Sequence, residues 1–217
     1  MENTKDSSAT RILLVRHGET EWNRIHRFQG RSDLPLNQEG RDQARALAAG
    51  LKDQSLTAIY SSPLSRAVET ARLINSFHPS VPFFEEVGLI EMNFGEFEGM
   101  EAGRWMVEHA DFLNLWREIP TSVRMPGGEN LLEVQARALN TLDRITKLYP
   151  IESTLLFCSH SFVNRTILCY ALQIPLDRFR EVQQEMTALN VLYLRGERLV
   201  ATVVNDRSHL TNSGRNE

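Results

Sequence analysis

Several features are scarce or missing in this sequence, and each absence argues against a class of protein. The 217 residues contain no apolar run close to the about 20 residues that a helix needs to cross a bilayer. They contain no long basic run either, and the net charge is −4, so nucleic acid is a poor default partner. The first ten residues, MENTKDSSAT, lack the apolar core of a signal peptide. We therefore expect a polar leader at 1–10, no membrane partner and a cytoplasmic location.

Cysteine is also scarce. Cys158 and Cys169 are the two cysteines, and both lie in apolar stretches. With so few cysteines and no export signal, we expect buried free thiols rather than a disulfide. Hydrophobic residues make up 41% and charged residues 24% of the chain, which is typical of a globular domain long enough to bury a full core.

Short apolar runs alternate with amphipathic stretches from about residue 10 to residue 205. The expected strands end at Val15 or cover 56–62, 153–160, 188–194 and 199–204. The expected helices cover about 37–51, 62–74, 130–148 and 162–172. Strands that alternate with helices predict an α/β fold, here a three-layer α/β/α domain at 11–210 with a mainly parallel central sheet. A polar tail is expected at 211–217.

Cap residues mark the starts of three of these helices. Asn37 can cap the first, and Ser62 followed by Pro63 predicts a cap and a proline at the first helical position. Asn130 with Glu133 resembles a capping box.

The stretch from about 94 to 130 does not follow this alternation. It predicts a small helical insertion that covers part of the molecule. Its aromatic residues Trp105, Phe112 and Trp116 are expected to pack within that insertion rather than to form a substrate box.

Chemically notable residues follow three of the expected strands. Arg16 and His17 follow the first strand, Arg66 follows the second after a short turn, and His160 ends the third. Ligands bind at the carboxyl ends of parallel strands in open α/β sheets. We therefore expect two arginines and two histidines at one edge of the sheet, although each of them taken singly is more often, or as often, structural.

Such a set suits phosphoryl transfer. The planar guanidinium of arginine binds phosphate oxygens in pairs, and a neutral imidazole can attack phosphorus to give a phosphohistidine. A second histidine can stabilise the charge that spreads over the transferring group. Glu91 offers a carboxylic acid that protonates the leaving oxygen, and Asn23 with the backbone at Gln29 and Gly30 offers neutral donors.

The same residues carry a family resemblance. The stretch LLVRHGETEWN resembles the Arg-His-Gly signature of the histidine phosphatase superfamily, in the branch of cofactor-dependent phosphoglycerate mutases and small-molecule phosphatases. The resemblance covers about residues 11 to 210 through the motifs RFQGRSDLPLNQEGRDQA, YSSPLSRAVETA, EMNFGEFEG, PGGEN, SHSFVNR and NDRSHL.

This resemblance implies a role for each residue. His17 is then the phosphorylated nucleophile, and Glu91 is the general acid and base. Arg16, Arg66 and His160 complete the phosphate pocket. Asn23, Gln29, Gly30 and Ser161 line the phosphate and substrate side. The resemblance implies neither a metal nor a cofactor. Many members have glycines after the second histidine, whereas this chain has Ser161 and Phe162, so the substrate preference of glycine-bearing members does not carry over.

Three functions remain open at this point. Mutases of this branch carry a longer insertion with extra basic and tyrosine residues, whereas here the segment between Gly99 and Gly127 holds arginines but no tyrosine or lysine. This favours a phosphatase for small phosphomonoesters, similar to α-ribazole phosphatase or to broad-specificity phosphatases. The alternatives are a phosphoglycerate mutase and a non-catalytic phosphate-binding regulatory protein. We expect a monomer or a homodimer.

Overall fold

A six-stranded sheet forms the centre of the computed structural model, which describes residues 9–211. The strand order is β3-β2-β4-β1-β5-β6. The strands are β1 (Thr10–Arg16), β2 (Ala58–Ser61), β3 (Phe83–Glu85), β4 (Thr154–Ser159), β5 (Leu189–Arg195) and β6 (Arg198–Asp206). The first four are parallel, and β5 and β6 are antiparallel to their neighbours. The prediction of a mainly parallel sheet is confirmed.

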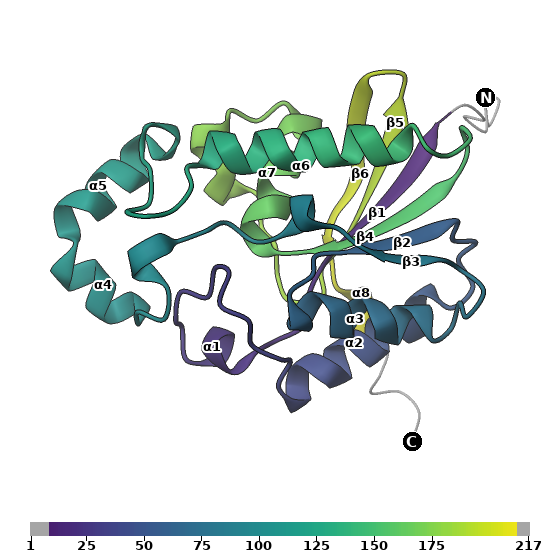
Figure 1. The fold of residues 1–217 in the computed structure, drawn as a ribbon, viewed down its shortest axis with the longest axis horizontal. Helices are drawn as coiled ribbons and strands as arrows, with labels where there is room; N and C mark the ends of the chain where they lie inside the picture. The colour runs from purple at the N-terminus through teal and green to yellow at the C-terminus, as the bar shows by residue number, and fades with distance from the viewer. Residues whose placement is uncertain (1–8, 212–217) are drawn as a thin grey trace.

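Helices cover both faces of this sheet (Figure 1). Helices α2 (Gln38–Leu51) and α3 (Ser65–Asn75) lie on one face, and α6 (Leu131–Thr146) and α7 (Ser161–Leu172) lie on the other. The shorter helices are α1 (Glu21–Arg24), α4 (Ala102–Glu108), α5 (Ala110–Glu118) and α8 (Ser208–Thr211). Four 3₁₀ turns complete the chain: η1 (Val87–Leu89), η2 (Gly95–Phe97), η3 (Pro120–Ser122) and η4 (Leu176–Glu181).

The alternation of side chains along β1 explains the three layers. Ile12 and Leu14 are fully buried in the core cluster shared with α6 and α7. Leu13 and Val15 are fully buried in the cluster shared with α2 and α3. Successive side chains of a strand point to opposite faces, so the apolar run 12–15 requires that both faces of the sheet be covered.

One local prediction is wrong, and one short strand was not predicted. Helix α3 begins at Ser65 with Leu64 as its N-cap, not at Ser62 and Pro63. The Oγ atom of Ser62 lies 2.7 Å from Nε2 of His160 instead of capping the first turn. Strand β3 was not predicted, because it has only three residues, of which Phe83 is partly buried and the other two are exposed.

Other predictions are confirmed. Asn37 caps α2 through Gly40, and Asn130 with Glu133 forms a capping box at α6. Cys158 and Cys169 are free and buried.

The leader and the tail that we expected fall largely outside the described residues. Thr10, the last residue of the expected leader, belongs to β1, and Thr211 belongs to α8. Between residues 9 and 211, no helix has the length and apolar character that a membrane crossing requires.

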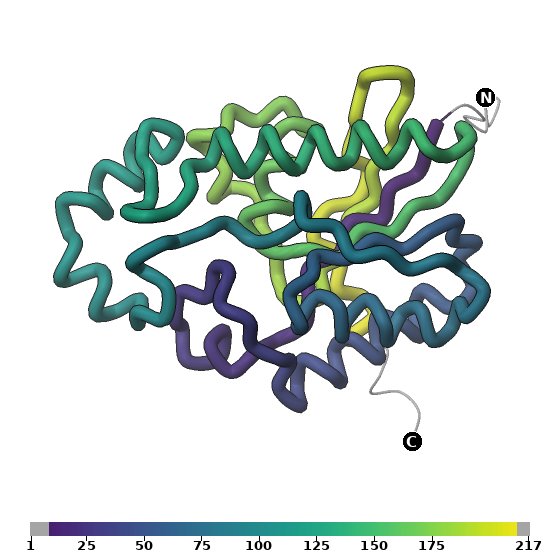
Figure 2. Tube along the Cα trace, viewed as in Figure 1, coloured from purple at the N-terminus to yellow at the C-terminus, as the bar shows by residue number. Residues whose placement is uncertain are grey.

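The stretch 94–130 folds as the helical insertion that we expected. Helices α4 and α5 project at one end of the molecule, next to α1, and the chain trace returns from there into α6 (Figures 1 and 2). Trp105 and Trp116 are 4% and 6% exposed and belong to the main core cluster. Trp105 packs against Phe97 and Phe112 within the insertion, as expected, whereas Trp116 packs against Phe162 and Phe179 outside it.

Candidate active site

The carboxyl ends of β1, β2 and β4 meet at one edge of the sheet. Arg16 pairs with Ser159, and Ser61 pairs with Cys158, so the three parallel strands end in register. His17, Ser62 and His160 are the residues that directly follow these strand ends. The expected convergence of the strand ends is present.

His17 is 3% exposed and held in one orientation. Its Nδ1 atom lies 2.7 Å from the carbonyl oxygen of Gly18, which can only accept, so Nδ1 carries the proton and Nε2 keeps the lone pair. That Nε2 atom lies 3.3 Å from Nε of Arg66. Burial lowers the pKa of His17 well below 6.5, and the charges of Arg66 and Arg16 lower it further. The imidazole is therefore neutral at neutral pH, the form that can act as a nucleophile.

The residue after His17 must be a glycine. A Cβ atom at Gly18 would lie 2.3 Å from the carbonyl oxygen of Gly40, at the start of α2. Because Gly18 also supplies the carbonyl that orients His17, this close approach fixes the ring relative to α2.

Arg66 is a buried cation in the first turn of α3, with 1% exposure. Its Nη1 atom donates to the carbonyl of Ser32 at 2.9 Å, and its Nη2 atom donates to that of Gly30 at 2.7 Å. Burial lowers the pKa of Arg66 to about 10, and the charge of Glu91 opposes this shift. Arg66 therefore stays charged at neutral pH.

Arg16, at the end of β1, is the second cation. Its Nη1 atom donates to the carbonyl oxygen of Gln184. Burial lowers the pKa of Arg16 to about 10 as well, again against the charge of Glu91. Two guanidinium groups with fixed orientations thus line the same cavity as a neutral histidine, an arrangement suited to a phosphate dianion.

His160 is fully buried, and its ring centroid lies 5.0 Å from that of His17. Burial lowers the pKa of His160 well below 6.5, with further lowering by Arg66 and His17. Its Nε2 atom lies 2.7 Å from Ser62 Oγ, which sets the plane of the ring.

Glu91 is 6% exposed and lies at the amino end of α7. Its Oε1 atom accepts from the backbone N–H of Met92 at 2.8 Å, and its Oε2 atom accepts from that of Phe162 at 3.3 Å. The carboxyl group is therefore oriented by two backbone donors, one of them in the first turn of the helix.

The neutral donors come from the loop around α1. Oδ1 of Asn23 accepts from the backbone N–H and the hydroxyl of Thr20, so its amide Nδ2 is the group left for a ligand. Gln29 is 7% exposed, and its Oε1 atom lies 2.9 Å from Thr20 Oγ1, sharing the one hydroxyl proton with Oδ1 of Asn23. Gly30 contributes its carbonyl to Arg66 and has a φ of +49°, which suits glycine.

These side chains enclose a cavity of about 150 Å³. The predicted residues that line it are Arg16, His17, Asn23, Gln29, Gly30, Arg66, Glu91 and Ser161. His160 lies behind this lining, against His17. Arg27, Phe28, Phe94 and Phe162 complete the wall. Trp105 of the insertion packs edge-on against Phe28 at 5.1 Å, so the insertion supports the wall from behind.

Three buried polar atoms at this site have no hydrogen-bond partner among residues 9–211. They are Nε of Arg16, Nε2 of Gln29 and Nδ1 of His160. Buried polar groups are normally paired, so a cluster of unpaired ones indicates a place where a polar ligand binds. The two amide and guanidinium groups are donors, which favours an anion.

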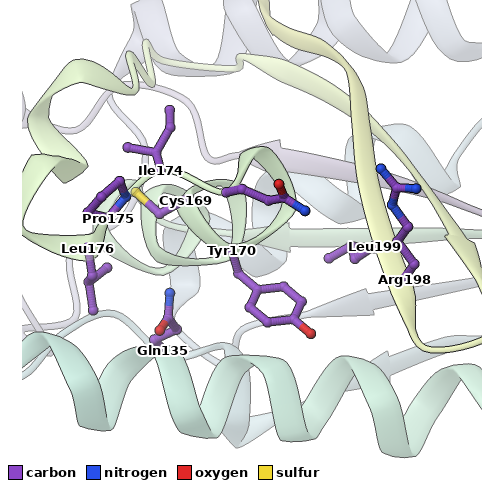
Figure 3. Close-up of a pocket in the computed structure, with 9 residues that line it drawn as sticks. Gln135, Cys169, Tyr170, Ile174, Pro175, Leu176, Arg198 and Leu199 are labelled. Atoms are coloured by element: carbon purple, nitrogen blue, oxygen red, sulfur yellow. The ribbon is translucent and has the colours of Figure 1, made fainter.

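A larger cavity of about 460 Å³ lies between α6, α7 and the start of β6 (Figure 3). Among the described residues that line it, Arg198 is the one charged group, and none is a histidine or a carboxylate. The side chains that could act on a phosphate ester therefore line the smaller cavity.

Comparison with known proteins now gives the family. A family model of the histidine phosphatase superfamily (branch 1) matches residues 12–207. The chain belongs to the histidine phosphatase superfamily. Members of this superfamily transfer phosphate through a phosphohistidine, and the chain is a phosphoric monoester hydrolase.

Individual relatives cover nearly the whole chain. Phosphoserine phosphatase 1 of Hydrogenobacter thermophilus is 32% identical over 200 residues, which are 92% of this chain and 94% of the relative. The metal-independent phosphoserine phosphatase of Arabidopsis thaliana is 30% identical over 96% of this chain and 87% of its own length. Among solved structures, YhfR of Bacillus stearothermophilus superposes with a TM-score of 0.87 at 29% identity, covering 93% of this chain and all of that one.

Several residues that orient the predicted site residues were not identified from the sequence. Ser62 orients His160, Thr20 orients both Asn23 and Gln29, and Gln184 supplies the carbonyl for Arg16. Each acts through a contact between segments that are distant or irregular, and their residue types are common, so the sequence carries no signal that would separate them from other polar residues.

Within residues 9–211, no three histidine, cysteine, aspartate or glutamate side chains lie close enough together to hold a metal ion.

Proposed function

We propose that this chain hydrolyses a small phosphomonoester without a metal, through a phosphohistidine on His17. The observation that carries the proposal is the buried, neutral His17, whose Nε2 lone pair faces the guanidinium of Arg66 at 3.3 Å. In the first step, Nε of Arg66 turns its hydrogen bond from Nε2 of His17 to a phosphoryl oxygen, Nε2 attacks phosphorus, and the ester P–O bond breaks. Glu91 protonates the leaving alkoxide.

In the second step, water attacks the phosphohistidine. The Glu91 carboxylate accepts a proton from that water, the P–N bond breaks, and inorganic phosphate leaves the neutral imidazole of His17. Arg16 and Arg66 bind the phosphoryl oxygens in both steps, and His160, Asn23 and Gln29 add donors to the developing charge. Gly30 and Ser161 line the path of the substrate.

We further propose phosphoserine as the first substrate to test. Two relatives that cover most of this chain carry the name phosphoserine phosphatase, and a cavity of about 150 Å³ suits a small alcohol portion. The aromatic side chains of Phe28, Phe94 and Phe162 form an apolar part of the wall. A cytoplasmic location and a monomeric or homodimeric state stay predictions from the sequence.

The test is phosphate release by the purified protein from phosphoserine, α-ribazole 5′-phosphate, p-nitrophenyl phosphate and 3-phosphoglycerate. We expect phosphate release from phosphoserine and from p-nitrophenyl phosphate, with the highest kcat/KM on phosphoserine. The variant His17→Gln should release no phosphate. Conversion of 3-phosphoglycerate into 2-phosphoglycerate without net hydrolysis would indicate a mutase. Binding of phosphate without turnover would indicate a regulatory protein.

A further inference from the structure

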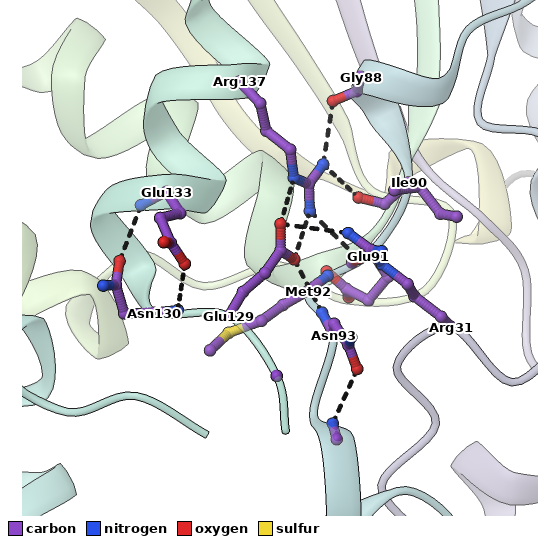
Figure 4. A network of polar contacts seen from close by, with 12 residues as sticks. Arg31, Gly88, Ile90, Glu91, Met92, Asn93, Glu129, Asn130, Glu133 and Arg137 are labelled. Carbon is purple, nitrogen blue, oxygen red and sulfur yellow. Dashed lines mark hydrogen bonds and ion pairs between the residues drawn. The ribbon is translucent and has the colours of Figure 1, made fainter. Parts of the chain in front are cut away.

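The segment that carries Glu91 has little regular structure of its own. It follows the short 3₁₀ turn η1 and belongs to no strand. The position of its carboxyl group therefore depends on contacts made by the backbone on either side. Figure 4 shows that these contacts converge on Arg137, a residue of α6.

Arg137 binds three carbonyl groups of this segment. Its Nη1 atom donates to the carbonyls of Gly88 and Ile90, at 3.0 and 2.6 Å, and its Nη2 atom donates to that of Glu91 itself, at 3.1 Å. A planar guanidinium can make such a fan of contacts, whereas the ammonium group of a lysine cannot reproduce its geometry.

Glu129 fixes the guanidinium from the other side. Its Oε1 accepts from Nε of Arg137 at 2.9 Å, and its Oε2 accepts from Nη2 at 3.1 Å. The same carboxylate accepts the backbone N–H of Asn93 at 2.9 Å and pairs with Arg31 at 3.2 Å. The backbone is thus held before Glu91 by Arg137 and after it by Glu129.

Arg31 extends this network to the loop that carries Gln29 and Gly30. It directly follows Gly30, whose carbonyl accepts from Arg66. Its backbone N–H also donates to Glu98 at 2.8 Å. The Arg137–Glu129 pair therefore ties the segment of Glu91 to the loop that orients Arg66.

We propose that Arg137 is a positioning residue for Glu91, with Glu129 as its partner. The proposal rests on the function proposed above, because it assumes that Glu91 protonates the leaving group. Catalysis is sensitive to small displacements of a reacting group, and a shift of about 1 Å can reduce the rate about 100-fold. Loss of Arg137 therefore reduces proton donation by Glu91 while leaving nucleophilic attack by His17 comparatively intact.

The readout is a ratio between two substrates. An alkyl phosphate such as phosphoserine needs a proton on its leaving oxygen, whereas p-nitrophenolate leaves with little help. The ratio of kcat/KM for phosphoserine to kcat/KM for p-nitrophenyl phosphate does not depend on the fraction of folded enzyme. A merely structural loss lowers both values equally, and a loss of positioning lowers the ratio.

The experiment measures this ratio for Arg137→Met, Arg137→Lys, Glu91→Gln and the double variant Arg137→Met/Glu91→Gln. We expect a drop of about 10–100-fold for Arg137→Met, a smaller drop for Arg137→Lys, and no further drop when Arg137→Met is added to Glu91→Gln. The control is Arg144→Met. Arg144 lies two turns further along α6 and pairs with Glu86, outside the contacts to Glu91. Its ratio should equal that of the wild type.

The outcomes separate this inference from the proposed function. A normal ratio in Arg137→Met together with a low ratio in Glu91→Gln overturns the role of Arg137 and leaves that of Glu91 in place. A normal ratio in Glu91→Gln overturns both. Additive losses in the double variant show that Arg137 acts on something other than Glu91, which also overturns the inference.

Discussion

The two buried histidines of the active site make the free energy of unfolding depend on pH. His17 is 3% exposed, His160 is fully buried, and their rings lie 5.0 Å apart. Burial lowers the pKa of both well below 6.5, and the charge of Arg66 adds to the effect at each ring. Below pH 6.5 the unfolded chain protonates these histidines, whereas the folded chain keeps them neutral.

The sign and size of the effect follow from proton linkage. The unfolded state binds more protons than the folded state. The contribution of these histidines to the free energy of unfolding is therefore fully present above about pH 7 and is lost as the pH drops. One histidine that stays neutral when folded lowers the free energy of unfolding by about 1.4 kcal/mol between pH 7.5 and 5.5, and the pair lowers it by about 3 kcal/mol.

Urea unfolding at pH 7.5, 6.5 and 5.5 measures this loss. His17→Gln and His160→Gln should each remove about 1.4 kcal/mol of the pH-dependent part, because glutamine does not titrate. The control is His26→Asn, since His26 is exposed and has a φ of +55° that asparagine tolerates. A wild-type stability that is flat over this range, or a His17→Gln variant with the wild-type slope, would refute the reasoning.

Three further results are expected. Excess EDTA should leave phosphate release unchanged, because arginine and histidine supply the positive charge; activity that returns only with magnesium or zinc would contradict this. Gly18→Ala should lower both Tm and activity, since its Cβ would lie 2.3 Å from the carbonyl oxygen of Gly40, with an overpacking cost of about 1–3 kcal/mol; an unchanged Tm would show that the loop yields. Gln29→Ala should lower kcat/KM about 10–100-fold by removing a buried donor to a charged group, and an unchanged value would remove Gln29 from the phosphate pocket.

Local patterns explain why much of the fold and part of the site could be predicted. Val15 ends a run that is buried on both faces, and Asn37 and Asn130 are caps whose signal lies within four residues. Because parallel strands end at one edge, the strand prediction alone brings His17 and His160 together.

The supporting contacts could not be predicted because nothing local encodes them. Ser62 precedes a proline and therefore resembles a helix cap, yet its hydroxyl serves a histidine 98 positions away. Arg137 is one of 24 basic residues, and its carbonyl partners lie 46 to 49 positions earlier in the chain. Such residues become distinguishable only when the segments are placed next to one another.

The covalent role of His17 is the central claim, and a rapid quench tests it most directly. The enzyme is mixed with a radiolabelled phosphomonoester and quenched in alkali. The labelled residue is then located by peptide mapping. The account predicts label on His17, stable in alkali and lost in acid, absent in His17→Ala and still present in His160→Ala, whose turnover should fall about 10²–10³-fold. Label on His160, Ser161 or Ser62 would contradict the assignment of the nucleophile to the end of β1.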